Sequence, residues 1–269
     1  MSASSLAAGR AQMPEGTHHI LDQRTLAASY RSLEVLIKPG MTVLDVGCGT
    51  GAITRGMAER AGPSGKVVGI DPSEPLVMQA REKYREVPGL EFIVADVYTY
   101  APAVPFDVVA SARTLQWLAN PYEALQRMAG FLKPGGILSV LDYNHEKINW
   151  NPVPPPSMQL FYDAFLRWRA DAGMQNDIAD RLAGYFETAG LLEIATTGQS
   201  ETVRRTDAGY ADKLGIWAKV AETRGHQLVV DGYVTEAQRQ AAVQDYTAWM
   251  ATEADRMEMY LLAVEGRVG

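Results

Sequence analysis

The sequence predicts an open α/β fold built from alternating strands and helices. Short apolar segments, such as residues 43–46 and 66–70, alternate with segments of helical periodicity, which is typical of βαβ units and a parallel sheet. A glycine-rich turn at 47–51 joins the first apolar segment to a helical one. Polar side chains also lie at the ends of three successive predicted strands, which is the edge where such a sheet binds its ligand.

Length and composition limit the class of protein. With 269 residues, the chain can form one large α/β domain with an insertion, or a domain with a small lid. Its hydrophobic content of 47% is ordinary for a globular protein. The net charge of −7 argues against nonspecific binding to nucleic acid, because that binding needs clustered Lys and Arg side chains. A local basic groove is still compatible with this charge.

Cysteine content and hydropathy predict a cytoplasmic protein. Cys48 is the single cysteine, so no intrachain disulfide is expected. We interpret Cys48 as a small residue of the glycine turn, with a reactive or metal-binding thiol as the alternative. The first twenty residues contain no apolar block typical of a secretion signal, and no run of 18 apolar residues predicts a membrane span.

The stretch 41–51 predicts the kind of ligand. Gly47, Gly49 and Gly51 give the spacing G-x-G-x-G, whereas the dinucleotide pattern is G-x-G-x-x-G. Asp45 precedes the first glycine by two residues, and a carboxylate there suits an ammonium or sulfonium group better than a pyrophosphate. These features favour S-adenosylmethionine. A nicotinamide or flavin site and a turn without a ligand are the alternatives.

The run VLDVGCGTG at residues 43–51 resembles the first motif of the class I S-adenosylmethionine-dependent methyltransferases. The Lys-Pro-Gly-Gly sequence at 133–136, followed by an apolar segment, is also similar to this family. The resemblance covers about residues 41–141 and implies a doubly wound, seven-stranded, mostly parallel sheet with helices on both faces. Beyond it, Trp217 and residues 246–249 resemble the C-terminal helices of quinone-biosynthesis methyltransferases and their relatives in secondary metabolism.

Residues 1–40 are expected to form a helical segment before the core. Residues 1–16 are small and polar, and we expect a frayed end. Apolar side chains at three- and four-residue intervals predict an amphipathic helix over 20–37, ended by 38–40. The resemblance implies that this segment closes over the cofactor and that Arg24 pairs with the methionine carboxylate. A solvated surface arginine is the alternative.

The core, residues 41–143, is predicted to hold the cofactor at the ends of successive strands. The second strand, 66–70, ends at Asp71, whose carboxylate can accept hydrogen bonds from both ribose hydroxyls. The resemblance implies that Asp96 contacts the adenine amino group and that the Val97 N–H contacts the ring nitrogen. The predicted cofactor-binding residues are Arg24, Asp45, Gly47, Gly49, Asp71, Pro72, Asp96, Val97 and Arg113.

The methyl acceptor is predicted to lie beside the turn after the fourth strand, 106–112. In the resembled family this turn and its short helix, 113–118, lie next to the transferred methyl group. The expected acceptor-side residues are Gln116, Trp117, Tyr143 and His145. If the acceptor is a hydroxyl or an acidic carbon, His145 is the candidate general base, because histidine titrates near neutral pH. A loop histidine that faces solvent is the alternative.

The C-terminal part is predicted to add a lid and a helical cap. Residues 144–157 hold four prolines and predict a connection, and an aromatic-rich helix at 158–170 completes a lid over 144–176. An ordinary packed face is the alternative for that helix. The part 177–269 returns to the sheet and carries inserted helices at 207–255. Its predicted elements are a helix at 177–189, a strand at 191–203, helices at 207–224 and 235–254, with a Thr235–Gln238 capping box opening the second, and an antiparallel strand at 257–264.

The predicted function is methyl transfer from S-adenosylmethionine to a small organic acceptor such as a quinone, a phenol or a secondary metabolite. In-line displacement at the sulfonium methyl group mainly requires alignment of the reactants and exclusion of water. No Asp/His cluster predicts a metal site, and the single cysteine argues against the arsenic methyltransferases, which rely on several thiols. The alternatives are a catalytically silent cofactor-binding module or regulator, and an NAD-dependent oxidoreductase. The sequence does not specify the oligomeric state.

Overall fold

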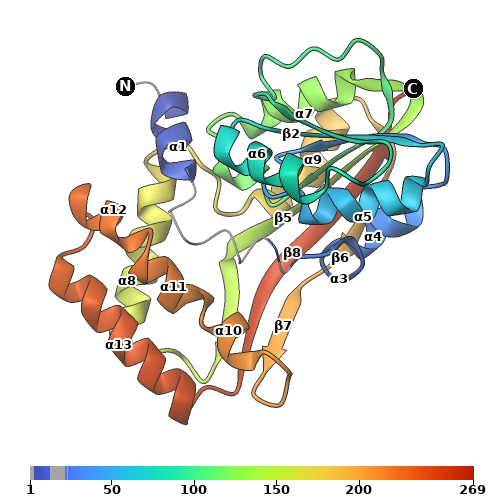
Figure 1. Ribbon diagram of the computed structural model, residues 1–269. Helices are drawn as coiled ribbons and strands as arrows, with labels where there is room; N and C mark the ends of the chain where they lie inside the picture. The colour runs from blue at the N-terminus through green and yellow to red at the C-terminus, as the bar shows by residue number, and fades with distance from the viewer. Residues whose placement is uncertain (1–2, 13–21, 23) are drawn as a thin grey trace.

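The molecule is organised around a mixed sheet of eight strands (Figure 1). The structure is a computed structural model that describes residues 3–12, 22 and 24–269. In this part of the chain the strand order is β3-β2-β1-β4-β5-β8-β6, and β7 also pairs with β8. The strands are β1 (Thr42–Val46), β2 (Lys66–Asp71), β3 (Leu90–Val94), β4 (Phe106–Ala112), β5 (Leu132–Asn151), β6 (Leu192–Gly198), β7 (Glu201–Arg204) and β8 (Arg256–Arg267).

The chain reverses its course across the sheet between β1 and β4. Strands β1 to β5 run parallel; β2 and β3 lie on one side of β1, and β4 pairs with the other side. In open α/β sheets, the crevice outside the carboxyl ends of the strands at such a reversal binds the ligand. The predicted doubly wound, mostly parallel sheet is confirmed, with eight strands in the described chain instead of seven.

Helices cover both faces of the sheet. They are α1 (Ala3–Ala11), α3 (Leu26–Ser29), α4 (Arg31–Leu36), α5 (Ala52–Ala61), α6 (Glu74–Lys83), the 3-10 helix η1 (Leu115–Trp117), α7 (Pro121–Gly130), α8 (Pro156–Ala170), α9 (Ile178–Thr188), α10 (Tyr210–Leu214), α11 (Ile216–Glu222), α12 (Gly225–Val230) and α13 (Glu236–Thr252). Strand side chains alternate between the faces, so Val43 packs in the core with α3 to α5 and Leu44 in the core with α7 and α9. No helix in the described ranges is long and apolar enough to cross a bilayer.

A further apolar core lies in a helical cap, formed by α8 and α10 to α13, beside the sheet (Figure 1). Large aromatic side chains, including Trp168, Trp217 and Tyr246, are buried there. The long strands β5 and β8 run from the sheet to this cap (Figure 1) and pair along most of their length. The predicted capping box at the start of α13 is present.

The prediction that residues 144–157 form a connection is wrong for residues 144–151, which belong to strand β5. Strand β5 continues through Asn151, with a register shift against β8 between Asn144 and Asn149. Ile148 and Trp150 pack against the core of the helical cap. Pairing with β8 and burial of these side chains therefore extend a strand into a stretch that shows little strand periodicity.

Two predictions for the N-terminal segment are wrong. In the expected frayed end, residues 3–11 form the helix α1, where Arg10 is buried and makes an ion pair with Asp231 at 3.4 Å; positions 1–2 and 13–16 lie outside the described residues. In the described part of 20–37, the single predicted helix is broken at Tyr30 into α3 and α4. The Tyr30 side chain is fully buried, with its hydroxyl 2.8 Å from Ser139 Oγ. The break thus lets a polar aromatic side chain reach the sheet.

Two predicted C-terminal elements are interrupted. Residues 191–203 form two strands, β6 and β7, which keep one register on β8 from Ala195 onward, after a shift between Leu192 and Ala195. The break falls at Gln199, whose side-chain oxygen accepts a hydrogen bond from the Arg31 N–H at 3.0 Å. The helix expected over 207–224 is divided into α10 and α11, with Gly215 between them.

Candidate active site

The glycine turn after β1 leaves no room for larger residues. Gly47 has a φ of +77°, and a Cβ there would lie 2.2 Å from Thr114 Oγ1. The N–H groups of Gly47 and Cys48 donate to the Ile70 carbonyl oxygen at 2.8 and 3.0 Å, which fixes the turn to the end of β2. The Thr50 hydroxyl is buried and has no hydrogen-bond partner in the described chain. A tight glycine cradle with an unpaired hydroxyl fits a polar ligand bound against the main chain.

Asp71, at the end of β2, ties the glycine turn to the following loop. Its two carboxylate oxygens accept hydrogen bonds from the N–H groups of Gly49 and Ser73, each at 2.9 Å. Burial raises the pKa of Asp71, and these two hydrogen bonds oppose the rise. Each oxygen keeps a further lone pair, so the carboxylate can still accept ribose hydroxyls. Pro72 follows it on the surface.

Asp96 and Val97 lie in the turn after β3, which ends at Val94. The Asp96 carboxylate is exposed, and its Oδ1 accepts a hydrogen bond from the Tyr98 N–H at 2.8 Å. The Val97 side chain is buried in the core with α7 and α9. This turn follows β3 at the same edge of the sheet as Asp71, which is where the adenine contacts are predicted.

Asp45 is buried at the centre of the sheet beneath the glycine turn. Its Oδ2 accepts a hydrogen bond from Thr54 Oγ1 of α5 at 2.6 Å. Burial raises the pKa of Asp45 to about 7. The hydrogen bond from Thr54 lowers the pKa, whereas the charge of Asp71 raises it further. Because a nearby cation favours the ionised carboxylate, this site fits the predicted positively charged ligand.

Arg113 lies in the turn after β4, and its side chain contacts residues of β5 and β7. Its φ of +59° lies in the left-handed region, which is uncommon for a residue other than glycine. Its Nε donates to the Tyr143 hydroxyl oxygen at 2.9 Å, and its Nη2 pairs with Glu201 and donates to the Ser29 carbonyl oxygen. The Nη1 atom is buried without a partner in the described chain. Burial disfavours the charge of Arg113, but Tyr143 and Glu201 outweigh it and raise the pKa.

Arg24 lies within electrostatic range of this group. Burial lowers the pKa of Arg24, as does the charge of Arg113, whereas Tyr143 and Glu201 act in the opposite direction. Although burial disfavours the Glu201 carboxylate, Arg113 and Arg24 lower its pKa. The charges of Arg24 and Arg113 thus both act on Glu201, beside the place where the methionine carboxylate is predicted.

Gln116 and His145 come from separate segments and contact each other directly. Gln116 Oε1 lies 2.6 Å from His145 Nε2. Gln116 Nε2 donates to the Arg113 carbonyl oxygen at 3.1 Å, and the Gln116 N–H donates to Asp142 Oδ2 at 3.0 Å. Burial raises the pKa of Asp142 to about 6. Tyr143 contacts both Arg113 and His145. The structure therefore brings together three of the predicted acceptor-side residues: Gln116, Tyr143 and His145.

The His145 ring lies in an aromatic box formed by Tyr143, Phe165 and Trp217. The ring centroids are 5.3, 6.1 and 6.2 Å from that of His145. Burial lowers the pKa of His145 well below 6.5, and the charge of Arg169 lowers it further. His145 Nδ1 is buried with no hydrogen-bond partner among the described residues. The imidazole is therefore neutral at physiological pH.

Comparison with known proteins identifies the family. A family model described as a methyltransferase domain matches residues 37–180. The chain belongs to this methyltransferase family. Trans-aconitate 2-methyltransferase of Rhodopseudomonas palustris (strain BisB18) is 37% identical over 119 residues, which are 44% of this methyltransferase and 45% of the relative. The enzyme of the same name from Azoarcus sp. (strain BH72) is 35% identical over 119 residues, with 44% and 46% covered. The matches thus span less than half of these relatives.

Solved structures share the fold of this methyltransferase. A SAM-dependent methyltransferase from Aquifex aeolicus has a TM-score of 0.53 at 18% identity, with 96% of this chain and 100% of that chain covered. Phosphoethanolamine N-methyltransferase 2 of Haemonchus contortus, in complex with S-adenosyl-L-methionine, has a TM-score of 0.52 at 18% identity, with 88% and 52% covered. The predicted class I S-adenosylmethionine-dependent methyltransferase family is confirmed, and with it the enzyme class.

Glu201 and Arg169 belong to this site but were not predicted from the methyltransferase sequence. Glu201 pairs with Arg113, and Arg169 Nη2 donates to the Gln116 carbonyl oxygen at 2.9 Å. Arg169 follows Phe165 by four residues, so a charged side chain stands on the apolar face of α8. That position was the available signal for Arg169; no local pattern marks Glu201.

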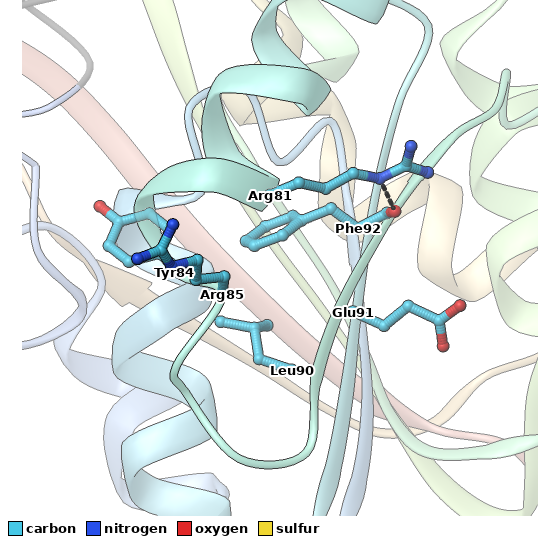
Figure 2. A pocket seen from close by; sticks show the side chains of 6 residues that line it. All are labelled: Arg81, Tyr84, Arg85, Leu90, Glu91 and Phe92. Atoms are coloured by element: carbon cyan, nitrogen blue, oxygen red, sulfur yellow. Dashed lines mark hydrogen bonds between the residues drawn. The ribbon is translucent and has the colours of Figure 1, made fainter.

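The pocket in Figure 2 lies apart from the methyltransferase site, between α6 and β3. It has a volume of about 340 Å³ and is lined by Arg81, Tyr84, Arg85, Leu90, Glu91 and Phe92. The dashed line marks the hydrogen bond of 2.8 Å from Arg81 Nε to the Phe92 carbonyl oxygen. None of the predicted site residues lines this pocket.

Within the described residues, no three His, Cys, Asp or Glu side chains gather as metal ligands.

Proposed function

We propose that this methyltransferase transfers the methyl group of S-adenosylmethionine to a carboxylate oxygen of a small organic acid. The curated relatives support this, because they are named for trans-aconitate, an organic acid. Bound S-adenosylmethionine supplies a methyl group that is already activated on a sulfonium. The protein therefore has to align the acceptor with that group and exclude water.

Side chains at the carboxyl edge of the sheet would hold the cofactor in this proposal. Asp71 would accept hydrogen bonds from the ribose hydroxyls, and Asp96 would contact the adenine amino group. Arg24 and Arg113 would hold the methionine carboxylate. The unpaired Nη1 of Arg113 supports this assignment, because a buried guanidinium nitrogen without a partner is stabilised by an anionic oxygen.

The burial of the His145 ring, near the charge of Arg169, is the observation that carries the choice of acceptor. A phenol or alcohol must lose a proton on methylation, and His145 would then carry a positive charge in a buried position near Arg169. That environment disfavours the charged imidazole. A carboxylate is already ionised at neutral pH and needs no base. We therefore assign His145, held in place by Gln116, to the wall of the acceptor site rather than to proton removal.

A phenol or quinol is the second candidate acceptor, in line with the predicted quinone, phenol or secondary metabolite. The aromatic box around His145 favours it, because flat apolar rings pack well against the edges and faces of Tyr, Phe and Trp rings. The two candidates differ in their need for a base.

Methyl-labelled S-adenosylmethionine separates these candidates. The purified chain is incubated with the labelled cofactor and with separate panels of carboxylic acids and phenols. We expect label in a base-labile methyl ester and a rate that is flat between about pH 6.5 and pH 8.5. Label in phenols alone would favour the second candidate, and cofactor binding with transfer to neither panel would favour a silent binding module. The cytoplasmic location stays a prediction.

A further inference from the structure

Two buried arginines flank one tryptophan ring next to the acceptor wall. The guanidinium carbons of Arg169 and Arg224 lie 4.6 and 4.5 Å from the centroid of the Trp117 ring. The Arg169 side chain comes from α8, and Arg224 stands at the start of α12. Both residues are buried, with 0% and 6% of their surface exposed. We name this group the arginine–tryptophan cluster.

Neither arginine of this cluster makes an ion pair with a carboxylate of the described chain. Arg169 Nε donates to Asn176 Oδ1 at 2.8 Å and its Nη2 donates to a backbone carbonyl, while its Nη1 is buried without a partner there. Arg224 donates only to the backbone carbonyl oxygens of Arg10 and Gln12 among these residues. Buried guanidinium groups are normally paired with acids, so this arrangement requires an explanation.

The acids closest to the cluster are committed elsewhere. Both carboxylate oxygens of Asp142 accept backbone N–H groups, although the Asp142 charge still acts on Arg169. Asp231 pairs with Arg10 at 3.4 Å and accepts the Trp168 indole N–H. Burial lowers the pKa of both Arg169 and Arg224 to about 10, which leaves them charged at neutral pH. Among the residues that the structure describes, positive charge therefore exceeds negative charge around this cluster.

We infer that the arginine–tryptophan cluster binds a second carboxylate group of the methyl acceptor, which makes the substrate a dicarboxylate or tricarboxylate. This inference rests on the proposed function, and it specifies a subsite that the methyl-transfer chemistry does not require. Gln116 places the subsite, because its side chain holds His145 at the acceptor wall while its carbonyl oxygen accepts from Arg169. The unpaired Arg169 Nη1 supplies a hydrogen-bond donor for the carboxylate.

Helix α1 covers this subsite. The Arg10 side chain donates to the Trp168 carbonyl oxygen, and the Arg10 carbonyl oxygen accepts a hydrogen bond from Arg224. Ala7 packs in one apolar cluster with Trp117. Figure 1 shows α1 lying beside α8 at the end of the helical cap. Because Arg169 has no exposed surface, α1 must shift to admit the acceptor and then close over it.

The test compares two acids that differ in their number of carboxylates, trans-aconitate and crotonate. In the wild type we expect a KM for trans-aconitate at least ~10-fold below that for crotonate, since hydrogen bonds between charged groups are among the strongest. Arg224→Gln and Arg169→Gln should abolish this difference, while Arg169→Lys should restore part of it. For Arg224→Gln, the kcat for crotonate and the Kd for S-adenosylmethionine should stay unchanged. The matched control is Arg239→Gln, which removes a guanidinium of the same cap that is paired with Glu236.

A second readout is independent of turnover. Trans-aconitate should raise the melting temperature of the wild type and of Arg239→Gln, but not that of Arg224→Gln. Equal KM values for the two acids in the wild type, or a preference that survives in both glutamine variants, would overturn the subsite while leaving the proposed function intact. If neither acid is methylated, the proposed function fails, and the melting-temperature difference alone decides whether the cluster binds a carboxylate.

Discussion

His145 Nε2 lies 2.6 Å from Gln116 Oε1, and this contact fixes the tautomer of the imidazole. Gln116 Nε2 donates to the Arg113 carbonyl oxygen, so the amide oxygen is the atom that faces His145. A hydrogen bond to that oxygen requires the proton on Nε2. The unprotonated Nδ1 is then left inside the aromatic box, without a partner in the described chain.

This arrangement predicts a small effect of His145→Gln on methylation of a carboxylic acid. Glutamine keeps a donor that can reach Gln116, and an ionised acceptor needs no base, so kcat should stay within about threefold of the wild type. Removal of a general base would lower kcat by about 100-fold or more. Steady-state rates from about pH 6 to pH 8 provide the measurement. A loss of that larger size, together with a wild-type rate that follows one ionisation, would establish His145 as the base.

Asp45 should make the stability of the cofactor-free protein depend on pH. Its pKa is about 7 in the folded protein, against an ordinary value of 3.8, so the folded chain holds an extra proton between these values. The free energy of unfolding should therefore decrease as the pH rises from about 4 to 7, by a few kcal/mol at most. Asp45→Asn should remove this part of the slope. Urea unfolding of both proteins at four pH values tests it, and parallel curves would contradict the assignment.

Gly47→Ala should destabilise the glycine turn through both strain and collision. A left-handed φ costs a non-glycine residue roughly 1–2 kcal/mol, and the new Cβ would also lie 2.2 to 2.8 Å from three atoms of Thr114. Gly209→Ala is the matched control, because Gly209 has a left-handed φ of +73° and the added Cβ would make only an ordinary contact, 3.8 Å from Lys213 Cε. Denaturant unfolding should show a larger loss for Gly47→Ala. Equal losses would mean that the Thr114 contact contributes nothing.

Asp71→Ala should weaken S-adenosylmethionine binding by at least ~10-fold, because a charged acceptor for hydrogen bonds is lost. The Gly49 and Ser73 N–H groups also lose their acceptor, so the glycine turn itself should loosen. Calorimetric titration gives the Kd. The surface variant Glu193→Gln, which removes an exposed ion pair with Arg267, should bind normally. An unaltered Kd for Asp71→Ala would remove Asp71 from the cofactor site.

The placement in the fold of the residues predicted to bind the cofactor could be predicted because its determinants are local. A glycine at positive φ and an acid at the end of a strand depend mainly on neighbouring residues. Gly47, Asp71 and Asp96 accordingly lie at the expected edge of the sheet. The strands of the core were equally predictable, because buried parallel strands are short apolar runs.

The acceptor half depends on contacts between distant segments, and no local period encodes them. Arg113 meets Glu201 across 88 residues, and Gln116 meets Arg169 across 53. Strand β5 extends to Asn151 because β8 pairs with it, and that partner comes about a hundred residues later in the chain. The break at Tyr30 likewise follows from its distant partner Ser139.

The ladder between β5 and β8 has a consequence for how such an enzyme changes over evolutionary time. It joins the sheet to the helical cap through main-chain hydrogen bonds, which do not depend on the side chains that the cap presents. The proposed wall of the acceptor site begins on this ladder: Tyr143 pairs with Leu261 of β8, and His145 follows within the register shift of β5. A lineage can thus replace cap residues and adopt a new acceptor while the donor machinery at the glycine turn keeps its geometry.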